Sequence, residues 1–81
     1  KTVFDDIKEI TIYPNPVKDN ILNIKSTYSN ISYKIYSTIG QLVSEGNVKN
    51  NAINIGDLNR AIYQITFSSE GEIITKQFIK Q

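Results

Sequence analysis

Tyr13-Pro14-Asn15-Pro16 is the stretch that most restricts how this chain can fold. Pro14 and Pro16 hold φ near about −65° and remove two backbone donors. Each proline also pushes the residue before it into extended geometry. Such a stretch fits neither a helix interior nor a fully paired central strand. We therefore predict a stiff, extended corner in which the side chain of Asn15 hydrogen-bonds to nearby backbone.

On both sides of this corner, apolar residues alternate with polar ones at a period of two. This period is typical of strands with one buried and one solvated face, and no segment shows the 3.6-residue period of a helix. Turn signals recur about every 8 to 12 residues, as in an antiparallel sandwich. We predict an all-β, antiparallel Ig-like β-sandwich of about seven strands. The predicted strands cover residues 10–13, 20–26, 31–36, 42–45, 52–55, 62–67 and 73–80.

The alternation also predicts which side chains face the core. Ile31, Tyr33 and Ile35 share one side of their strand, whereas Tyr36 has the opposite phase and is predicted to be a surface aromatic. The same reasoning assigns Tyr63, Ile65 and Phe67 to the core and places Leu22 and Ile24 together on one face of their strand.

Three turns are marked by their composition. Gly40 stands where a hairpin loop requires a positive φ. Residues 68–72 form a polar stretch around a glycine and predict a hairpin loop. Residues 56–61 predict a compact turn whose one large apolar side chain, Leu58, plugs the end of the core.

The length of 81 residues predicts one domain, and we place it at residues 10–81. Residues 1–9 are mixed and charged and predict a lead-in from a larger parent protein, which the absence of an initiator Met also suggests. Their acidic residues Asp5, Asp6 and Glu9 leave a calcium site conceivable, because hard cations bind carboxylate oxygens. The cluster lacks a glycine turn and an alternating ligand pattern, so a solvated lead-in is the preferred interpretation.

The composition argues against several classes of function. The chain has no Cys and no His, which removes thiol chemistry and the commonest metal ligand and acid–base side chain. Nine basic residues against eight acidic ones leave a net charge of +1 without the basic stripe of a nucleic-acid-binding protein. No apolar run reaches the length of about 18 residues that suggests a membrane span. We predict a non-enzyme with no cofactor, no metal, no nucleic-acid partner and no stable membrane insertion.

Four stretches stand in a definite order along the chain: Tyr13–Pro16 with the strand at 21–24, residues 35–43 around Gly40, residues 53–63 with Leu58 and Tyr63, and residues 75–80. In this order they resemble the C-terminal sorting domain, type A, of the bacterial type IX secretion system (the Por secretion system). The resemblance covers about residues 10–81. One departure is Ala61, where the family usually has Gly; if that position needs a positive φ, Ala has a steric cost.

The resemblance implies an Ig-like domain that directs its parent protein across the outer membrane after export to the periplasm. It further implies two protein partners, the type IX translocon and a sortase-like protease that removes the domain in or before residues 1–9. The parent then reaches the cell surface or the extracellular space. The alternative is an accessory Ig-like or fibronectin-like module, acting as a spacer, an adhesin or a glycan binder. The oligomeric state is left open.

We predict that the recognition surface combines the Pro corner with the final strand. An exposed strand edge offers unpaired backbone groups to which a partner strand can add. Deletion of residues 78–81 is then predicted to block secretion while leaving the sandwich folded. The alternative for these residues is fold maintenance, with Phe78 or Ile79 packed in the core and Pro14 and Pro16 only shaping the corner. The residues assigned to recognition are Pro14, Asn15, Pro16, Lys76, Gln77, Phe78, Ile79 and Lys80, and those assigned to family turns and core are Gly40, Leu58, Ala61 and Tyr63.

Overall fold

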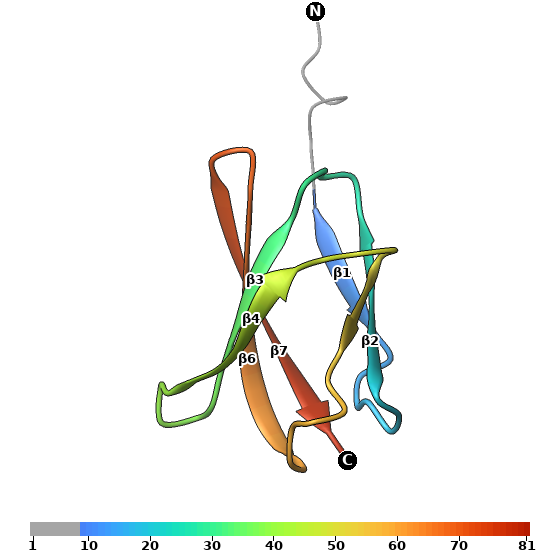
Figure 1. Ribbon diagram of the computed structural model, residues 1–81, viewed down its shortest axis with the longest axis vertical. Coiled ribbons are helices and arrows are strands. Elements are labelled where there is room, and N and C mark those ends of the chain that lie inside the picture. Colours follow the sequence, from blue (N-terminus) through green and yellow to red (C-terminus); the bar gives the residue numbers. More distant parts are fainter. Residues whose placement is uncertain (1–8) are drawn as a thin grey trace, which may run out of the picture.

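The computed structural model describes residues 9–81 and places them in two β-sheets packed face to face (Figure 1). One sheet has the strand order β1-β2-β5 and the other β4-β3-β6-β7, and every neighbouring pair is antiparallel. The prediction of an all-β, Ig-like antiparallel sandwich of seven strands is confirmed. The strands are β1 Ile10–Tyr13, β2 Ile21–Ser26, β3 Ser32–Tyr36, β4 Leu42–Asn47, β5 Ala52–Asn54, β6 Ala61–Ser69 and β7 Glu72–Lys80.

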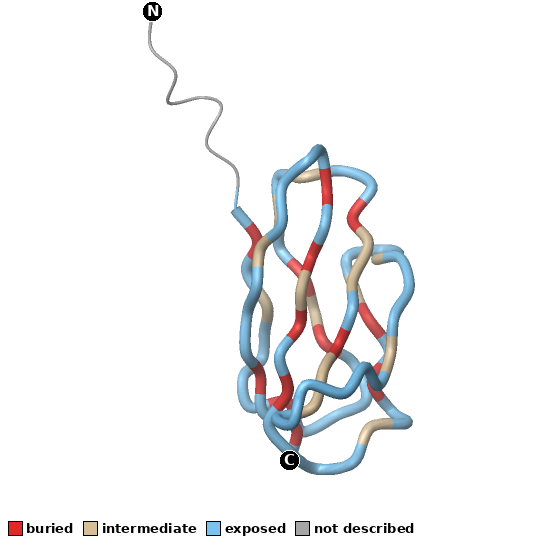
Figure 2. Tube along the Cα trace, turned by 90° about the vertical axis from the view of Figure 1, so that its left-hand side faces the viewer, coloured by how far each residue is buried: buried red, intermediate tan, exposed pale blue. Residues whose placement is uncertain are grey.

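The core lies between the two sheets and is built from alternate residues of their strands, which appear as red segments in Figure 2. In β6, Tyr63, Ile65 and Phe67 are buried and the residues between them are more exposed. Leu22 and Ile24 of β2 face them from the other sheet. Burying one such side chain stabilises the fold by about 1.5–3 kcal/mol. The predicted core positions are therefore confirmed.

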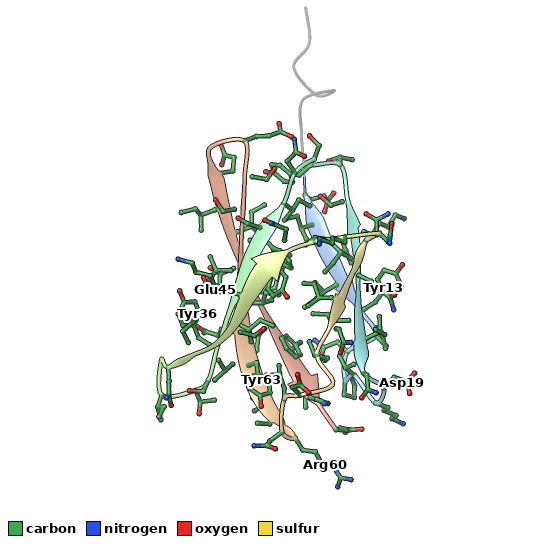
Figure 3. The ribbon with its side chains drawn as sticks, viewed as in Figure 1. Tyr13, Asp19, Tyr36, Glu45, Arg60 and Tyr63 are labelled. Carbon is green, nitrogen blue, oxygen red and sulfur yellow. The ribbon has the colours of Figure 1, made fainter. Side chains whose placement is uncertain are left out.

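The two tyrosines of β3 lie on opposite faces, as the alternation predicts. Tyr33 is half-buried and packs against the core beside Ile31 and Ile35, which are both buried. Tyr36 points away from the other sheet, as does Glu45 of β4 (Figure 3). One face of this sheet is thus apolar and covered, and the other is open to solvent.

The β6–β7 hairpin is longer than the sequence predicts. Glu70 and Gly71, with φ of 52° and 81°, form a two-residue turn of the kind that joins antiparallel strands tightly. Ser68 and Ser69 on one side pair with Ile73 and Glu72 on the other. The predicted loop over residues 68–72 is therefore wrong in extent, because these polar residues continue the strands instead of leaving them.

Other strand ends also differ by one or two residues from prediction. β4 continues through Gly46 to Asn47, where the sequence suggests a stop. Gly46 lies opposite Tyr33 in the ladder, and an added Cβ there would come within 3.1 Å of the Tyr33 Oη. The glycine thus makes room for a tyrosine and does not end the strand. At β5, Gly56 N–H donates to Asn54 Oδ1 at 2.8 Å, which turns the chain after Asn54.

Two predicted turn features are confirmed. Gly40 has φ of 83°, and its N–H donates to the Ser37 carbonyl at 3.0 Å across the β3–β4 turn. Leu58 is half-buried and packs against the core from the loop between β5 and β6. That loop also contributes to the site described next.

Candidate functional site

The loop between β1 and β2 crosses from one sheet to the edge of the other. Both X-Pro bonds of its Pro corner are cis. Beyond the corner, Val17 N–H donates to the Ile79 carbonyl at 2.7 Å, and Gln81 N–H donates to the Val17 carbonyl at 2.8 Å. These bonds form a parallel bridge between Val17 and Lys80, and the Val17 side chain is fully buried. The loop therefore adds one residue to the outer edge of the four-stranded sheet, beside the last residues of β7.

Asn15 holds the corner against β7 through its side-chain amide. Its Oδ1 accepts from the Ile79 N–H at 3.0 Å, and its Nδ2 donates to the Gln77 carbonyl at 3.2 Å. The amide thus offers one acceptor and one donor to the strand edge, as the peptide group of a neighbouring strand would. The prediction that Asn15 bonds to backbone is confirmed, but the partners lie 62 and 64 residues further along the chain.

Lys80 points inward and is 9% exposed. Its Nζ donates to the carbonyls of Ile55 at 2.8 Å, Leu58 at 2.7 Å and Gly56 at 3.4 Å. An ammonium group has three donors and no acceptor, so three converging carbonyl oxygens match its hydrogen-bonding capacity. The loop between β5 and β6 is therefore wrapped around the charge at the end of β7.

Tyr63 and Phe78 hold the same loop from the core side. Their rings stack with centroids 5.5 Å apart and an interplanar angle of 27°. Tyr63 Oη donates to the Asn59 carbonyl at 2.7 Å. Figure 3 shows Tyr63 at the end of the molecule where Arg60 lies. The aromatic pair thus connects the core to the loop that encloses Lys80.

We call this set the C-terminal junction: Asn15, Val17, loop residues 55–58 and residues 77–81. It joins three segments that are far apart in the sequence, and Figure 1 shows the β1–β2 loop at the same end of the molecule as the C-terminus. The sequence-based hypothesis grouped the Pro corner with the final strand, and the structure brings these two segments into direct hydrogen-bonding contact.

The residues predicted for recognition differ sharply in their exposure. Pro14, Asn15 and Pro16 are exposed, as are Lys76 and Gln77, and Ile79 is 38% exposed. Phe78 is fully buried and Lys80 is buried in the junction. These last two can contribute to recognition only by holding the surface in place. Phe78 belongs to the core, as the alternative interpretation of this residue expected, so the prediction that the domain stays folded without residues 78–81 loses its support.

The family turn and core residues are divided between two places. Leu58 lies in the C-terminal junction and Tyr63 stacks on Phe78 beside it, whereas Gly40 lies in the β3–β4 turn. Ala61 begins β6 and pairs with Lys80. It is not among the residues with positive φ, which in the described chain are Asn30, Asn50, Asn51, Glu70, Gly40 and Gly71. Ala at this position therefore avoids the steric cost that a left-handed conformation would impose.

Sequence reasoning missed two parts of the junction, Val17 and the carbonyl groups that surround Lys80. One signal for Lys80 was present, since it has the same strand phase as the core residue Phe78, but phase alone did not decide its burial, because Lys76 shares that phase and is exposed. Val17 gave only a weak signal, as an isolated apolar residue directly after a Pro corner. The loop carbonyls gave none, because a backbone acceptor has no residue type.

A hollow opens on the solvent face of the four-stranded sheet. This trough has a volume of about 570 Å³, and Tyr36 lines it together with Thr66. Lys34 and Glu45 lie side by side in the ladder there and also line it, so the lining charges balance. An aromatic ring beside hydroxyl groups is the feature that a glycan-binding module would use, and it lies on the face opposite to the core.

Two predictions concern the N-terminal residues, most of which lie outside the described range. Asp5 and Asp6 lie outside the described residues, so the calcium hypothesis stays a prediction, as does the lead-in over residues 1–9. Within residues 9–81, no helix is long and apolar enough to cross a membrane.

The chain is similar to a known protein family. Residues 11–81 match the family model described as the secretion system C-terminal sorting domain. No curated protein matches the chain. The matched range contains all seven strands except the first residue of β1, and it includes the whole C-terminal junction.

Proposed function

This chain belongs to the family of secretion system C-terminal sorting domains, and from this premise we propose how it acts. Domains of this family are non-catalytic signals for type IX secretion. They interact with the type IX secretion machinery and send proteins to the cell surface or the extracellular space. The match over residues 11–81 is the observation that carries the proposal.

The domain directs its parent protein through the type IX translocon after the parent has entered the periplasm. A sortase-like protease then removes the domain on the cell surface. Cleavage falls in or before residues 1–9, which form the lead-in to the domain at residues 10–81. The domain is a substrate in both steps and has no catalytic role of its own.

The recognition surface combines the Pro corner with the final strand. In its favour, Asn15 joins the two segments through hydrogen bonds to Gln77 and Ile79. Pro14, Pro16 and Lys76 are exposed around this contact and available to a partner. Phe78 and Lys80 act from beneath, by holding the strand end against the core and the loop.

A fusion assay tests the sorting function. Residues 1–81 are attached to the C-terminus of a fluorescent protein that is exported to the periplasm, in a host with a type IX system and in one without it. We expect the reporter at the surface or in the medium of the competent host only. Periplasmic retention in both hosts, with the domain folded, would contradict the proposal.

The proteolytic step has a separate readout. The mass of the exported reporter is compared between the competent host and a host that lacks its sortase-like protease. We expect loss of the domain in the first and an intact fusion in the second. An exported reporter that keeps the domain in both hosts would remove the protease from the proposal while leaving sorting untouched.

The accessory-module alternative has one observation in its favour, the trough beside Tyr36 on the outer sheet face. It requires no type IX system. Binding of the isolated domain to a neutral oligosaccharide, lost in Tyr36→Ala and accompanied by periplasmic retention of the fusion, would favour it. Family membership makes sorting the better supported function.

A further inference from the structure

The backbone groups of β7 alternate between its two sides. In an antiparallel strand, each residue directs both its N–H and its C=O to one neighbour, and successive residues face opposite neighbours. Ile79 directs its N–H to Asn15 and its C=O to Val17, away from β6. By this alternation, Ile73, Thr75 and Gln77 also direct their backbone groups to the outer edge of the sheet.

The C-terminal junction covers only part of this outer edge. Asn15 occupies the Gln77 carbonyl, and Asn15 and Val17 together occupy both groups of Ile79. Within the described residues, β7 has a single strand partner, β6. The backbone groups of Ile73 and Thr75 and the N–H of Gln77 therefore form an open edge, which we call the 73–77 edge.

The side chains along this edge have a distinct chemistry. Ile73 is 71% exposed, which is unusual for a large apolar side chain beside a row of free backbone groups. The Lys76 side chain is exposed and, among residues 9–81, forms no hydrogen bond or ion pair. The edge thus offers an apolar contact at one end and an uncompensated positive charge three residues away.

We propose that the 73–77 edge takes up an extended strand of a protein partner, which adds to the four-stranded sheet beside β7. The partner strand has an apolar residue against Ile73 and a carboxylate near Lys76. Main-chain hydrogen bonds supply the affinity and these two side chains the specificity. This inference rests on the proposed sorting function. It places the site of strand recognition at residues 73–77, before the buried residues Phe78 and Lys80.

The charge on the edge favours a foreign strand over a second copy of this domain. If two β7 edges paired antiparallel around Thr75, both Lys76 side chains would lie on the same face of the joined sheet. Like charges that are close on one sheet face destabilise the pairing. A partner strand with a carboxylate near Lys76 stabilises the pairing instead.

The first test blocks strand addition with proline. Thr75→Pro removes the outward N–H, and proline is tolerated on an edge strand because it removes no bond to β6. Thr75→Val is the matched control, since it keeps the N–H and the size of the side chain. In the fusion assay we expect Thr75→Pro to lower surface export at least about tenfold and Thr75→Val to leave it unchanged. Equal export of both variants would overturn the proposal.

A second test does not depend on the fold accepting proline. Lys76→Glu reverses the charge of an exposed residue, where substitutions have little effect on stability. Lys25→Glu makes the same change on β2 of the other sheet and serves as its control. We expect Lys76→Glu to reduce export and Lys76→Arg to retain it. Loss of export in Lys25→Glu as well would show that export depends on the net charge of the domain, and it would contradict the edge proposal.

These outcomes separate the edge from the sorting function. If the unmodified fusion is not exported, the sorting function itself fails. If the unmodified fusion, Thr75→Pro and Lys76→Glu are all exported equally, sorting holds and the edge proposal fails. Size-exclusion chromatography of the isolated domain completes the test, because a dimer that Thr75→Pro dissociates would show that a second copy occupies the edge.

Discussion

Lys80 shows how one residue can depend on three backbone acceptors. A buried charge is costly unless hydrogen bonds compensate for the lost water. Here the carbonyls of Ile55, Gly56 and Leu58 provide that compensation, and within the described residues no carboxylate takes part. The ammonium therefore ties the last strand to the loop between β5 and β6.

Removing this ammonium should weaken the domain. Lys80→Met keeps the apolar stem but leaves buried carbonyl groups without their donor, which costs about 1–3 kcal/mol. Urea unfolding of the isolated domain measures the change. Lys76→Met is the control, because Lys76 is exposed and its replacement should change stability by no more than about 0.5 kcal/mol. Equal stability of the two variants would show that the buried contacts contribute nothing.

Ala61 allows a prediction against the family pattern. Its backbone does not require the left-handed conformation, and it begins a paired strand. Ala61→Gly should therefore lower stability by about 0.5–1 kcal/mol, because glycine loses more conformational freedom on folding. A melting curve of the isolated domain checks the direction. A more stable Gly variant would mean that the turn before β6 is strained by alanine.

At the scale of elements, the Pro corner covers part of the outer edge of the four-stranded sheet. The Asn15 amide and the Val17 backbone together replace a neighbouring strand over residues 77–81. Natural sheets commonly cover or shorten their edges, since open edges recruit other chains. The corner covers the end of β7 and leaves its beginning open.

Replacing Asn15 tests this role of the corner. Asn15→Ala removes two side-chain hydrogen bonds at an exposed site and should cost about 1 kcal/mol. Hydrogen exchange of the Ile79 amide should rise at the same time, because its acceptor is gone. Asp19→Ala, four residues further along the same loop, is a control that touches neither bond. Unchanged protection of Ile79 would mean that the loop backbone alone covers the edge.

At the scale of the whole molecule, the chain end is part of the core. Phe78 is fully buried and stacks on Tyr63, so its loss alone costs about 3–5 kcal/mol. Total stabilities of small domains are about 5–15 kcal/mol, and deletion of residues 78–81 also removes Lys80.

We therefore expect the deletion of residues 78–81 to unfold the domain. Far-UV circular dichroism should show loss of the β signal and of a cooperative melt. Deletion of Gln81 alone is the control, since it removes a single bond to Val17 and should leave a folded domain. A folded truncated domain would contradict this and would restore the deletion as a clean test of recognition.

Much of the fold could be predicted because it depends on local patterns. The alternation in β6 identified Tyr63, Ile65 and Phe67 as core, and Gly40 marked its turn through its backbone freedom. Strand ends were less predictable, because Ser68 and Ser69 pair in a hairpin for reasons that lie in the opposite strand. Gly46 was misread for the same reason, since its role is to accommodate Tyr33 across the ladder.

The sequence by itself determined the class of fold, the faces of the strands and the family, because these follow from alternation and from motifs in order. Only the tertiary structure decided that Lys80 is buried, that Val17 bridges to the last strand and that the corner covers half of its edge. These contacts join residues more than 20 and up to 64 positions apart. Local patterns cannot encode them, since they depend on how the two sheets bring distant segments together and on backbone acceptors that every residue carries.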